Sequence, residues 1–161
     1  MFRHSAQKKK EKSMPNPRPE YPRPILRRDR WLNLNGLWDF AADPDGVGVS
    51  ERWQNRTEWP SAITVPFAPN SAASGCTVDP DVQRVWYHRS FDNPNWQGEE
   101  VILNIGACDF ITTVFVNGHA VGSHTGGYSP IKLNITAALQ AGENHLAIKV
   151  KDSGSWQQPR G

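Results

Sequence analysis

The length and period of the apolar runs limit the fold of this chain more than any other feature. From Trp31 onward these runs are short, many of them alternate with polar residues, and Gly, Pro, Asn or Asp separates them. An amphipathic helix needs apolar residues three or four positions apart over ten or more residues, and no window shows that period convincingly. Alternation places every second side chain on the same face of a strand. The pattern therefore predicts an all-β protein.

The punctuation between the runs indicates how the strands are connected. Asn117-Gly118 lies between two runs and favours a type I′ hairpin, in which both turn residues take positive φ. Asp43-Pro44-Asp45-Gly46 predicts a turn after the first strand. We expect one helical turn over 136–139, capped by Thr136 and stopped by Gly142. The expected strands are residues 34–41, 62–65, 85–91, 100–105, 111–116, 120–122, 128–135 and 146–150. Seven or eight strands of this spacing predict a β-sandwich or jelly roll.

Length and charge bound the organisation of the chain. With 161 residues it fits one domain of ordinary size. Residues 1–24 are rich in Lys and Pro and contain no apolar run, so we expect a disordered basic arm there and the folded domain over 25–161. The net charge of +2 is carried largely by this arm, which leaves the body near neutral or slightly acidic. This distribution argues against a nucleic-acid partner for the fold itself.

Targeting segments and disulfides are not indicated by the sequence. No run of 18 apolar residues exists, so no membrane partner is expected. No secretory signal is visible, which predicts a cytoplasmic protein, or a periplasmic or secreted one if a signal was removed. Cys76 and Cys108 are the two cysteines, one in a Ser/Gly loop and one in an apolar strand, and we expect both to be free.

Motifs in a fixed order give the chain a resemblance to a known family. Their positions are Leu34 to Phe40 (LNGLWDF), Val65-Pro66-Phe67, Trp86 to Phe91 (WYHRSF), Gly106 to Phe110 (GACDF), Val114 to Gly118 (VFVNG), Val121 to Pro130 (VGSHTGGYSP), Asn134-Ile135-Thr136 and Gly142-Glu143-Asn144. Over about residues 21–161 this series resembles the N-terminal sugar-binding domain of family 2 glycoside hydrolases, the β-galactosidase and β-glucuronidase type. Cys108, Ile131 and His88 depart from the usual Val, Phe and Arg, and Cys and Ile still suit apolar packing.

The resemblance implies a galactose-binding-domain-like jelly roll whose role is to bind carbohydrate. Gln158 to Gly161 is similar to a segment that in full-length family members leads into an immunoglobulin-like domain and then a catalytic barrel. Retaining glycosidases use two carboxylates about 5 Å apart, and the resemblance places both in that barrel. In this chain Glu99 and Glu100 are adjacent on an expected strand, so they point to opposite faces.

Three functions therefore stay open. The first is a non-catalytic module that forms one wall of a β-glycosidase pocket and supports oligomer contacts, with the C-terminal domains of the same enzyme and a terminal β-linked sugar as partners. The second is a fragment whose function is that of the parent β-galactosidase or β-glucuronidase. The third is a structural spacer without sugar contact.

Asp152, Trp156 and Arg89 are the candidate sugar-binding residues. Asp152 directly follows the last expected strand, and the resemblance implies an acidic residue here that accepts hydrogen bonds from sugar hydroxyls. An Asx turn that closes the strand is an equal alternative for Asp152. Trp156 stands in a polar segment where no core position is expected. Arg89 lies near a position where some relatives carry an Asn that touches the sugar.

Neither a metal nor a cofactor is expected. The five histidines show no tight spacing and no Cys or carboxylate partner at ligand spacing. We expect His124 to be held by backbone groups of its turn, the alternative being a loop packed closely on another domain. Trp38 and Trp86 lie within alternating strands and are expected in the core.

Overall fold

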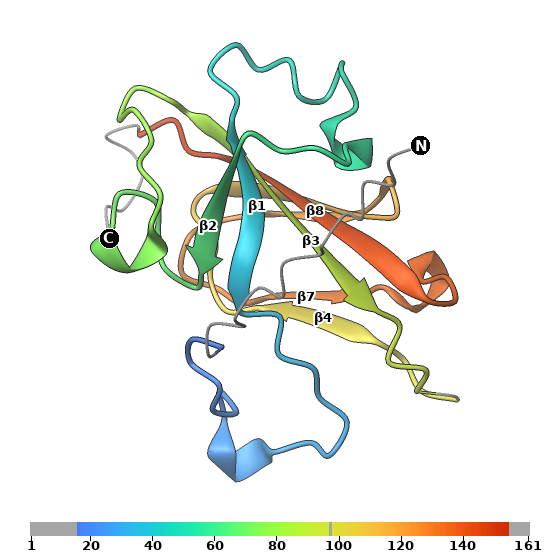
Figure 1. Ribbon diagram of the computed structural model, residues 1–161. Helices are drawn as coiled ribbons and strands as arrows, with labels where there is room; N and C mark the ends of the chain where they lie inside the picture. The colour runs from blue at the N-terminus through green and yellow to red at the C-terminus, as the bar shows by residue number, and fades with distance from the viewer. Residues whose placement is uncertain (1–15, 97, 155–161) are drawn as a thin grey trace, which may run out of the picture.

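The computed structural model describes residues 16–96 and 98–154 and shows an all-β jelly-roll sandwich (Figure 1). The strands are β1 (Gly36–Ala42), β2 (Ser61–Val65), β3 (Arg84–Asp92), β4 (Ile102–Ile105), β5 (Ile111–Val116), β6 (His119–Thr125), β7 (Ile131–Asn134) and β8 (Glu143–Lys151). Four short 3-10 helices join them: η1 (Pro24–Leu26), η2 (Trp53–Asn55), η3 (Ala72–Ser74) and η4 (Thr136–Ala138). Within the described ranges no helix is long and apolar enough to cross a membrane.

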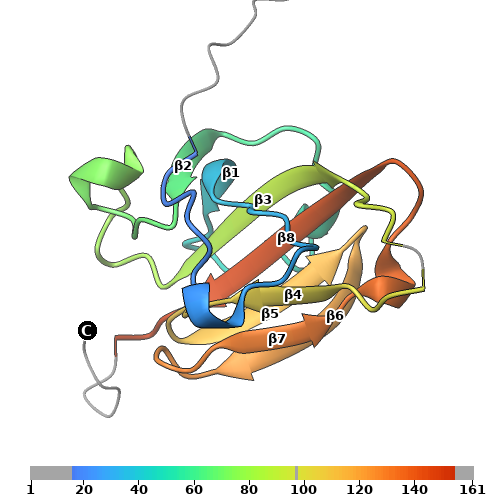
Figure 2. The ribbon, with the colours of Figure 1, turned by 90° about the horizontal axis from the view of Figure 1, so that it is seen from below.

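Six strands form the larger layer, and β4 pairs with β7 in the smaller one (Figure 2). The order in the larger sheet is β2-β1-β3-β8-β5-β6, with antiparallel pairing throughout. Neighbours in the sheet are therefore often far apart in sequence, as with β3 and β8. A jelly roll builds its two layers from such long-range pairs.

The main core lies between the two layers. Alternation gives the larger sheet an inner face on which Phe40 and Leu146 are each 1% exposed. Partly buried residues of the smaller layer, Leu103 and Leu133, pack against this cluster. A side chain at Gly122 would collide with Leu133, which shows how closely β6 and β7 approach. Apolar burial between the layers is the main force that holds the sandwich together.

The outer face of the larger sheet is covered by the loop over residues 43–60. Trp86 points outward from β3, yet it is fully buried because Trp53 of this loop lies over it with ring centroids 6.1 Å apart. Phe115 stacks on the same indole at 5.7 Å. These residues form a second apolar cluster, separate from the core between the layers.

Most turn and core predictions are confirmed. Asn117 and Gly118 have φ of 50° and 81°, as the type I′ turn requires. Trp38 and Trp86 are buried. Cys76 and Cys108 are both free.

Three boundary expectations are wrong in detail. The helical turn is η4, and Thr136 does not cap it; instead Asn134 accepts hydrogen bonds from the Thr136 backbone N–H and hydroxyl. Gly142, with φ of 79°, lies in the turn before β8 and does not end the helix. Strand β7 begins only at Ile131, since residues 126–130 form the connection from β6 and not the start of a strand.

Candidate functional site

Asp152 lies at the end of β8, where the chain leaves the sandwich. Its backbone N–H donates to the Gln83 carbonyl at 2.9 Å, which fixes its place beside the start of β3. A hollow of about 290 Å³ opens there, lined by Pro80, Asp81, Val82, Gln83, Asp152, Ser153 and Gly154. The Asp152 side chain is exposed. The hollow therefore offers one wall with an exposed carboxylate.

The two alternatives for Asp152 are compatible in the structure. Its Oδ1 accepts the Gly154 N–H at 2.8 Å, which is the Asx turn. Its Oδ2 accepts no hydrogen bond from any described residue. A carboxylate has about four acceptor positions, so one oxygen can support the turn while the other faces a ligand.

A second carboxylate, Asp109, stands at the same end of the sandwich. Residue Ile111 of β5 pairs with Lys151 of β8, so the residues just before β5 and just after β8 come together. Asp109 is exposed, yet partial desolvation, and then the negative charge of Asp152, raise its pKa. A side chain at Gly127 would lie only 2.6 Å from the Asp109 carboxylate, so glycine permits the neighbouring loop to close on it.

The sequence analysis did not single out Asp109 as a site residue. It belongs to the motif over 106–110, but a residue in a connection between strands has no partner that local patterns reveal. The pairing of β5 with β8 could have identified it. These strands are antiparallel neighbours, so Asp109, just before β5, and Asp152, just after β8, lie at the same end of the strand pair. That pairing was not evident from the order of the motifs.

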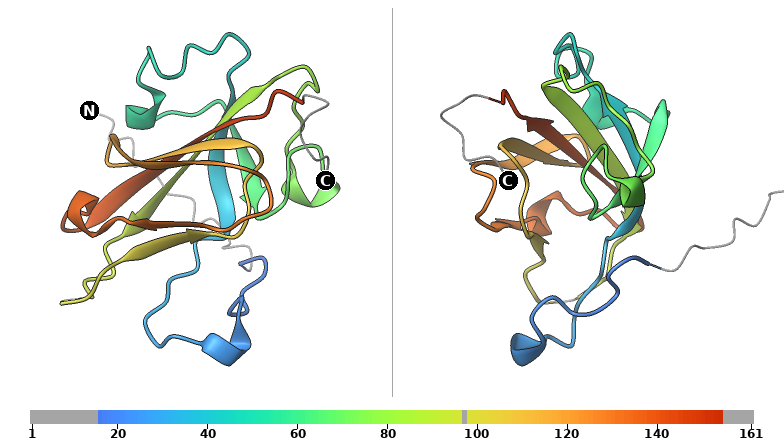
Figure 3. Two further views of the ribbon diagram at one scale, coloured as in Figure 1. Left: turned by 180° about the vertical axis from the view of Figure 1, so that it is seen from behind. Right: turned by 90° about the vertical axis from the view of Figure 1, so that its left-hand side faces the viewer.

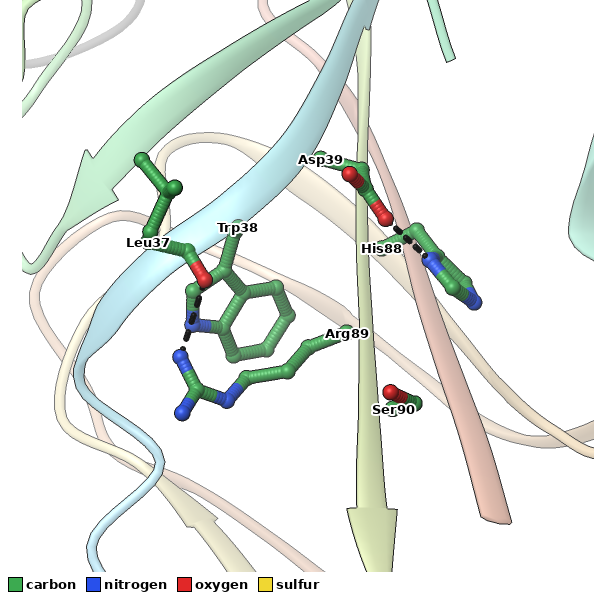
Figure 4. Close-up of a pocket in the computed structure, with 6 residues that line it drawn as sticks. All are labelled: Leu37, Trp38, Asp39, His88, Arg89 and Ser90. Carbon is green, nitrogen blue, oxygen red and sulfur yellow. Dashed lines mark hydrogen bonds and ion pairs between the residues drawn. The ribbon is translucent and has the colours of Figure 1, made fainter. Parts of the chain in front are cut away.

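Arg89 is not brought together with Asp152. It stands on β3 six residues beyond Gln83, about 20 Å along the strand. Its Nη1 donates to the Leu37 carbonyl at 2.9 Å, and burial lowers its pKa. Figure 4 shows the guanidinium reaching β1 across a separate hollow of about 240 Å³, lined by Leu37, Trp38, Asp39, His88, Arg89 and Ser90. In this structure Arg89 ties β3 to the start of β1.

Trp156, the third predicted site residue, lies outside the described residues. Its role as a sugar contact stays a prediction.

A polar chain on the outer face of the larger sheet was also missed. His88 is nearly buried; its Nδ1 lies 2.8 Å from Asp39 Oδ2 and its Nε2 lies 3.2 Å from His145 Nδ1. Trp59 stacks on the His88 ring at 5.3 Å. The chain continues to Glu143, 3.6 Å from His145 Nε2. It links β1, β3 and β8 beneath the covering loop, so its visible role is to hold these elements together.

Among the described side chains, no three His, Cys, Asp or Glu residues gather in a way that could hold a metal ion. His124 bonds through Nε2 to the Ser129 hydroxyl at 2.9 Å, so a side chain of its loop holds it, where backbone groups were expected.

Comparisons with known proteins bear on the whole domain. Residues 31–160 match the family described as "Glycosyl hydrolases family 2, sugar binding domain". A β-glucuronidase of Paenibacillus borealis is 33% identical over 140 residues, which cover 85% of this chain and 23% of that protein. A β-galactosidase of Thermoanaerobacter pseudethanolicus is 34% identical over 123 residues, covering 74% of this chain and 16% of that protein.

The solved structures agree with the fold. The β-glucuronidase of Ruminococcus gnavus in complex with D-glucuronic acid superposes with a TM-score of 0.64 at 28% identity. The match covers 74% of this chain and 21% of that one. This chain thus spans about a fifth of the length of the proteins it matches.

Proposed function

This chain belongs to the sugar-binding domains of the family 2 glycosyl hydrolases, and from that premise we propose that it is the N-terminal carbohydrate-binding module of a retaining β-glycosidase. In this proposal the sandwich end with Asp109 and Asp152 forms one wall of the active-site pocket. The observation that carries it is the pairing of two exposed carboxylates at one end of the sheet.

The chemistry of the pair suits a sugar. Carboxylate oxygens accept hydrogen bonds from hydroxyl groups, and an ionised acceptor makes the stronger bond. Asp152 also raises the pKa of Asp109, so their neighbouring negative charges oppose each other. Groups held near a like charge at a surface hollow are typical of functional sites, where a ligand compensates for the repulsion.

The module is not catalytic in isolation under this proposal. The parent enzyme hydrolyses a terminal β-linked sugar with carboxylates supplied by another domain, and a glucuronide or galactoside is the substrate class that the relatives suggest. The spacer alternative is favoured if Asp152 and Trp156 are both buried against the sandwich; Asp152 is exposed, and Trp156 lies outside the described residues. That exposure favours sugar contact.

The first test uses the chain alone. Purified protein is expected to release no nitrophenol from p-nitrophenyl β-D-glucuronide or β-D-galactoside above buffer. Hydrolysis that the Asp109→Asn or Asp152→Asn substitution abolishes would show that the catalytic pair lies in this chain and would remove the proposal.

The second test places the chain in an enzyme. Residues 1–161 replace the matching N-terminal part of the Ruminococcus gnavus β-glucuronidase, and kcat/KM is measured for the chimera and its Asp152→Asn variant. Loss of a charge-assisted hydrogen bond, about 1.5–3 kcal/mol, lowers kcat/KM by about tenfold to a hundredfold or slightly more. Asp45→Asn, an exposed carboxylate in the outer loop, is the matched control. Unchanged kinetics would remove Asp152 from the pocket wall and leave it to the Asx turn, which the Asn side chain also supports through its Oδ1.

A further inference from the structure

A closed loop precedes β1, and we name residues 17–35 the N-terminal loop. Its two ends are joined by side chains: Asn33 donates to the Arg18 carbonyl at 3.0 Å and Asn35 to the Pro17 carbonyl at 3.3 Å. Farther along, the rings of Tyr21 and Trp31 meet edge to face with centroids 4.9 Å apart. These contacts fix the loop as a unit, and it stands away from the sandwich (Figures 1 and 3).

The tip of this loop is apolar and lies in water. It carries η1, in which Ile25 is 94% exposed and Leu26 68% exposed. Leu32 and Trp31 on the returning limb are 45% and 37% exposed. Single exposed aliphatic residues are ordinary on protein surfaces, but a group of four on a loop closed by its own hydrogen bonds is typical of an interface.

The charge around the tip is strongly positive. Five arginines lie between residues 18 and 30, against Glu20 and Asp29. Arg18 pairs with Glu20 and Arg30 with Glu99. Arg23, Arg27 and Arg28 are exposed and make no ion pair with any described residue. A surface that complements the loop is therefore acidic and contains an apolar hollow for the two aliphatic side chains.

We propose that the N-terminal loop, residues 17–35, is a docking finger that binds the domains that follow this one in the assembled enzyme. Ile25 and Leu26 insert into an apolar hollow, and acidic residues of those domains surround it. The inference rests on the proposed function, because the relatives are about five times as long as the segment matched here and their remaining length supplies the partner. The finger precedes the start of β1, whereas the Asp109 and Asp152 end lies near the far end of β1, because Ala42 pairs with Val85 of β3 and the neighbouring Arg84 pairs with Lys151 of β8. Docking at the finger and sugar contact at the carboxylates are thus separate properties.

Hydrogen exchange in the chimera described above tests the docking. Backbone amides of residues 25–32 are expected to exchange at least tenfold more slowly in the chimera than in the chain alone, since a docked tip is shielded from water. Amides of the loop over 43–60 serve as the control and are expected to exchange equally in both. Equal exchange of residues 25–32 in the two proteins would overturn the docking finger.

A matched pair of variants tests the residues. Ile25→Ser combined with Leu26→Ser is expected to return the exchange of residues 27–32 in the chimera to the rate of the free chain, because buried apolar anchors dominate interfaces. Val49→Ser, which alters an aliphatic side chain that is 50% exposed in the other loop, is expected to leave that exchange unchanged. Protection that survives the double substitution would overturn the role of the tip.

The outcomes separate this inference from the proposed function. Protection of the finger together with an Asp152→Asn variant of normal kcat/KM would keep the docking and remove the pocket wall. A kinetic effect of Asp152→Asn without protection would do the reverse. Sedimentation velocity of the chain alone tests whether the finger instead binds a second copy of this chain. A dimer that dissociates when Ile25→Ser and Leu26→Ser are introduced would show such self-association and overturn the proposal.

Discussion

Two loops flank β1, and they differ in the solvent exposure of their apolar residues. The loop over 43–60 follows β1 and turns Trp53 back onto the sheet, where it is 7% exposed. The N-terminal loop precedes β1 and holds Ile25 at 94% exposure. Both are closed by hydrogen bonds within the loop, so internal order does not separate them. They differ in whether the sheet beside them offers an apolar surface.

The loop over 43–60 meets such a surface because of one buried carboxylate. Asp43 is 1% exposed and accepts hydrogen bonds from the backbone of Val47 and Gly48 and from the indole of Trp86. The loop is thereby fastened to the outward-facing tryptophan of β3. Apolar residues in this loop thus stabilise the domain, whereas Ile25 and Leu26 of the N-terminal loop lie exposed to water.

The largest expected effect concerns the indole beneath the covering loop. Trp86→Ala removes a fully buried side chain that touches both Trp53 and Phe115, and the free energy of unfolding is expected to fall by about 3–5 kcal/mol. Urea denaturation of the chain alone measures it. A loss below 1 kcal/mol would mean that the outer cluster contributes little, and the contrast between the loops would disappear.

Removal of the Asp43 carboxylate is expected to have the second-largest effect on stability. Asp43→Ala leaves the Val47 N–H, the Gly48 N–H and the Trp86 indole N–H without their acceptor, and we expect a loss of about 2–3 kcal/mol in the free energy of unfolding. Asp45→Ala, at an exposed position of the same turn, is the control and should change little. Equal effects of the two would show that the loop is held by its apolar contacts alone.

The close approach at Gly48 gives a smaller effect. A methyl group there would overlap the Trp86 indole nitrogen and approach the Asp43 carboxylate to 2.8 Å. Gly48→Ala is therefore expected to lower the free energy of unfolding by about 1–2 kcal/mol, as overpacked sites do. Gly106→Ala is the matched control, because a methyl group there meets nothing within 4 Å and Gly106 does not take a positive φ. A Gly48→Ala protein that is more stable than the wild type would contradict the close packing of the loop against Trp86 and Asp43.

The smallest effect is expected at the other loop. In the chain alone, Ile25→Ser and Leu26→Ser are expected to shift the free energy of unfolding by no more than about 0.5 kcal/mol each, because both side chains already contact water. Thermal and urea denaturation measure it. A loss of 2 kcal/mol would show that the tip packs on its own domain, and the two loops would then be alike.

Local patterns account for much of what was predicted. The positive φ of Asn117 and Gly118 is a property of two adjacent residues, so the hairpin was predictable. Trp38 faces the core between the layers from an alternating strand, so its burial follows from the local pattern. Trp86 faces outward, and Trp53 sits in a loop with no period, so each of these two is buried only because the other lies opposite.

The candidate site divides in the same way. The position of Asp152 directly after a strand was evident from the sequence, and so was the Asx turn as one of its two roles. Three features were not evident from the sequence. They are the proximity of Asp109 to Asp152, the separation of Arg89 from both carboxylates, and the polar chain from Asp39 through His88 to His145.

The sequence by itself determined the strands, the turns and the family, because alternation, turn chemistry and motif order are written along the chain. The tertiary structure alone decided which strands are neighbours. Strand β8 lies between β3 and β5, and only that pairing brings Asp109 to Asp152 and His88 to His145. The physical reason is that the inner faces of several strands are similarly apolar, so burial favours many pairings locally, and the one observed is selected by the packing of the whole sandwich.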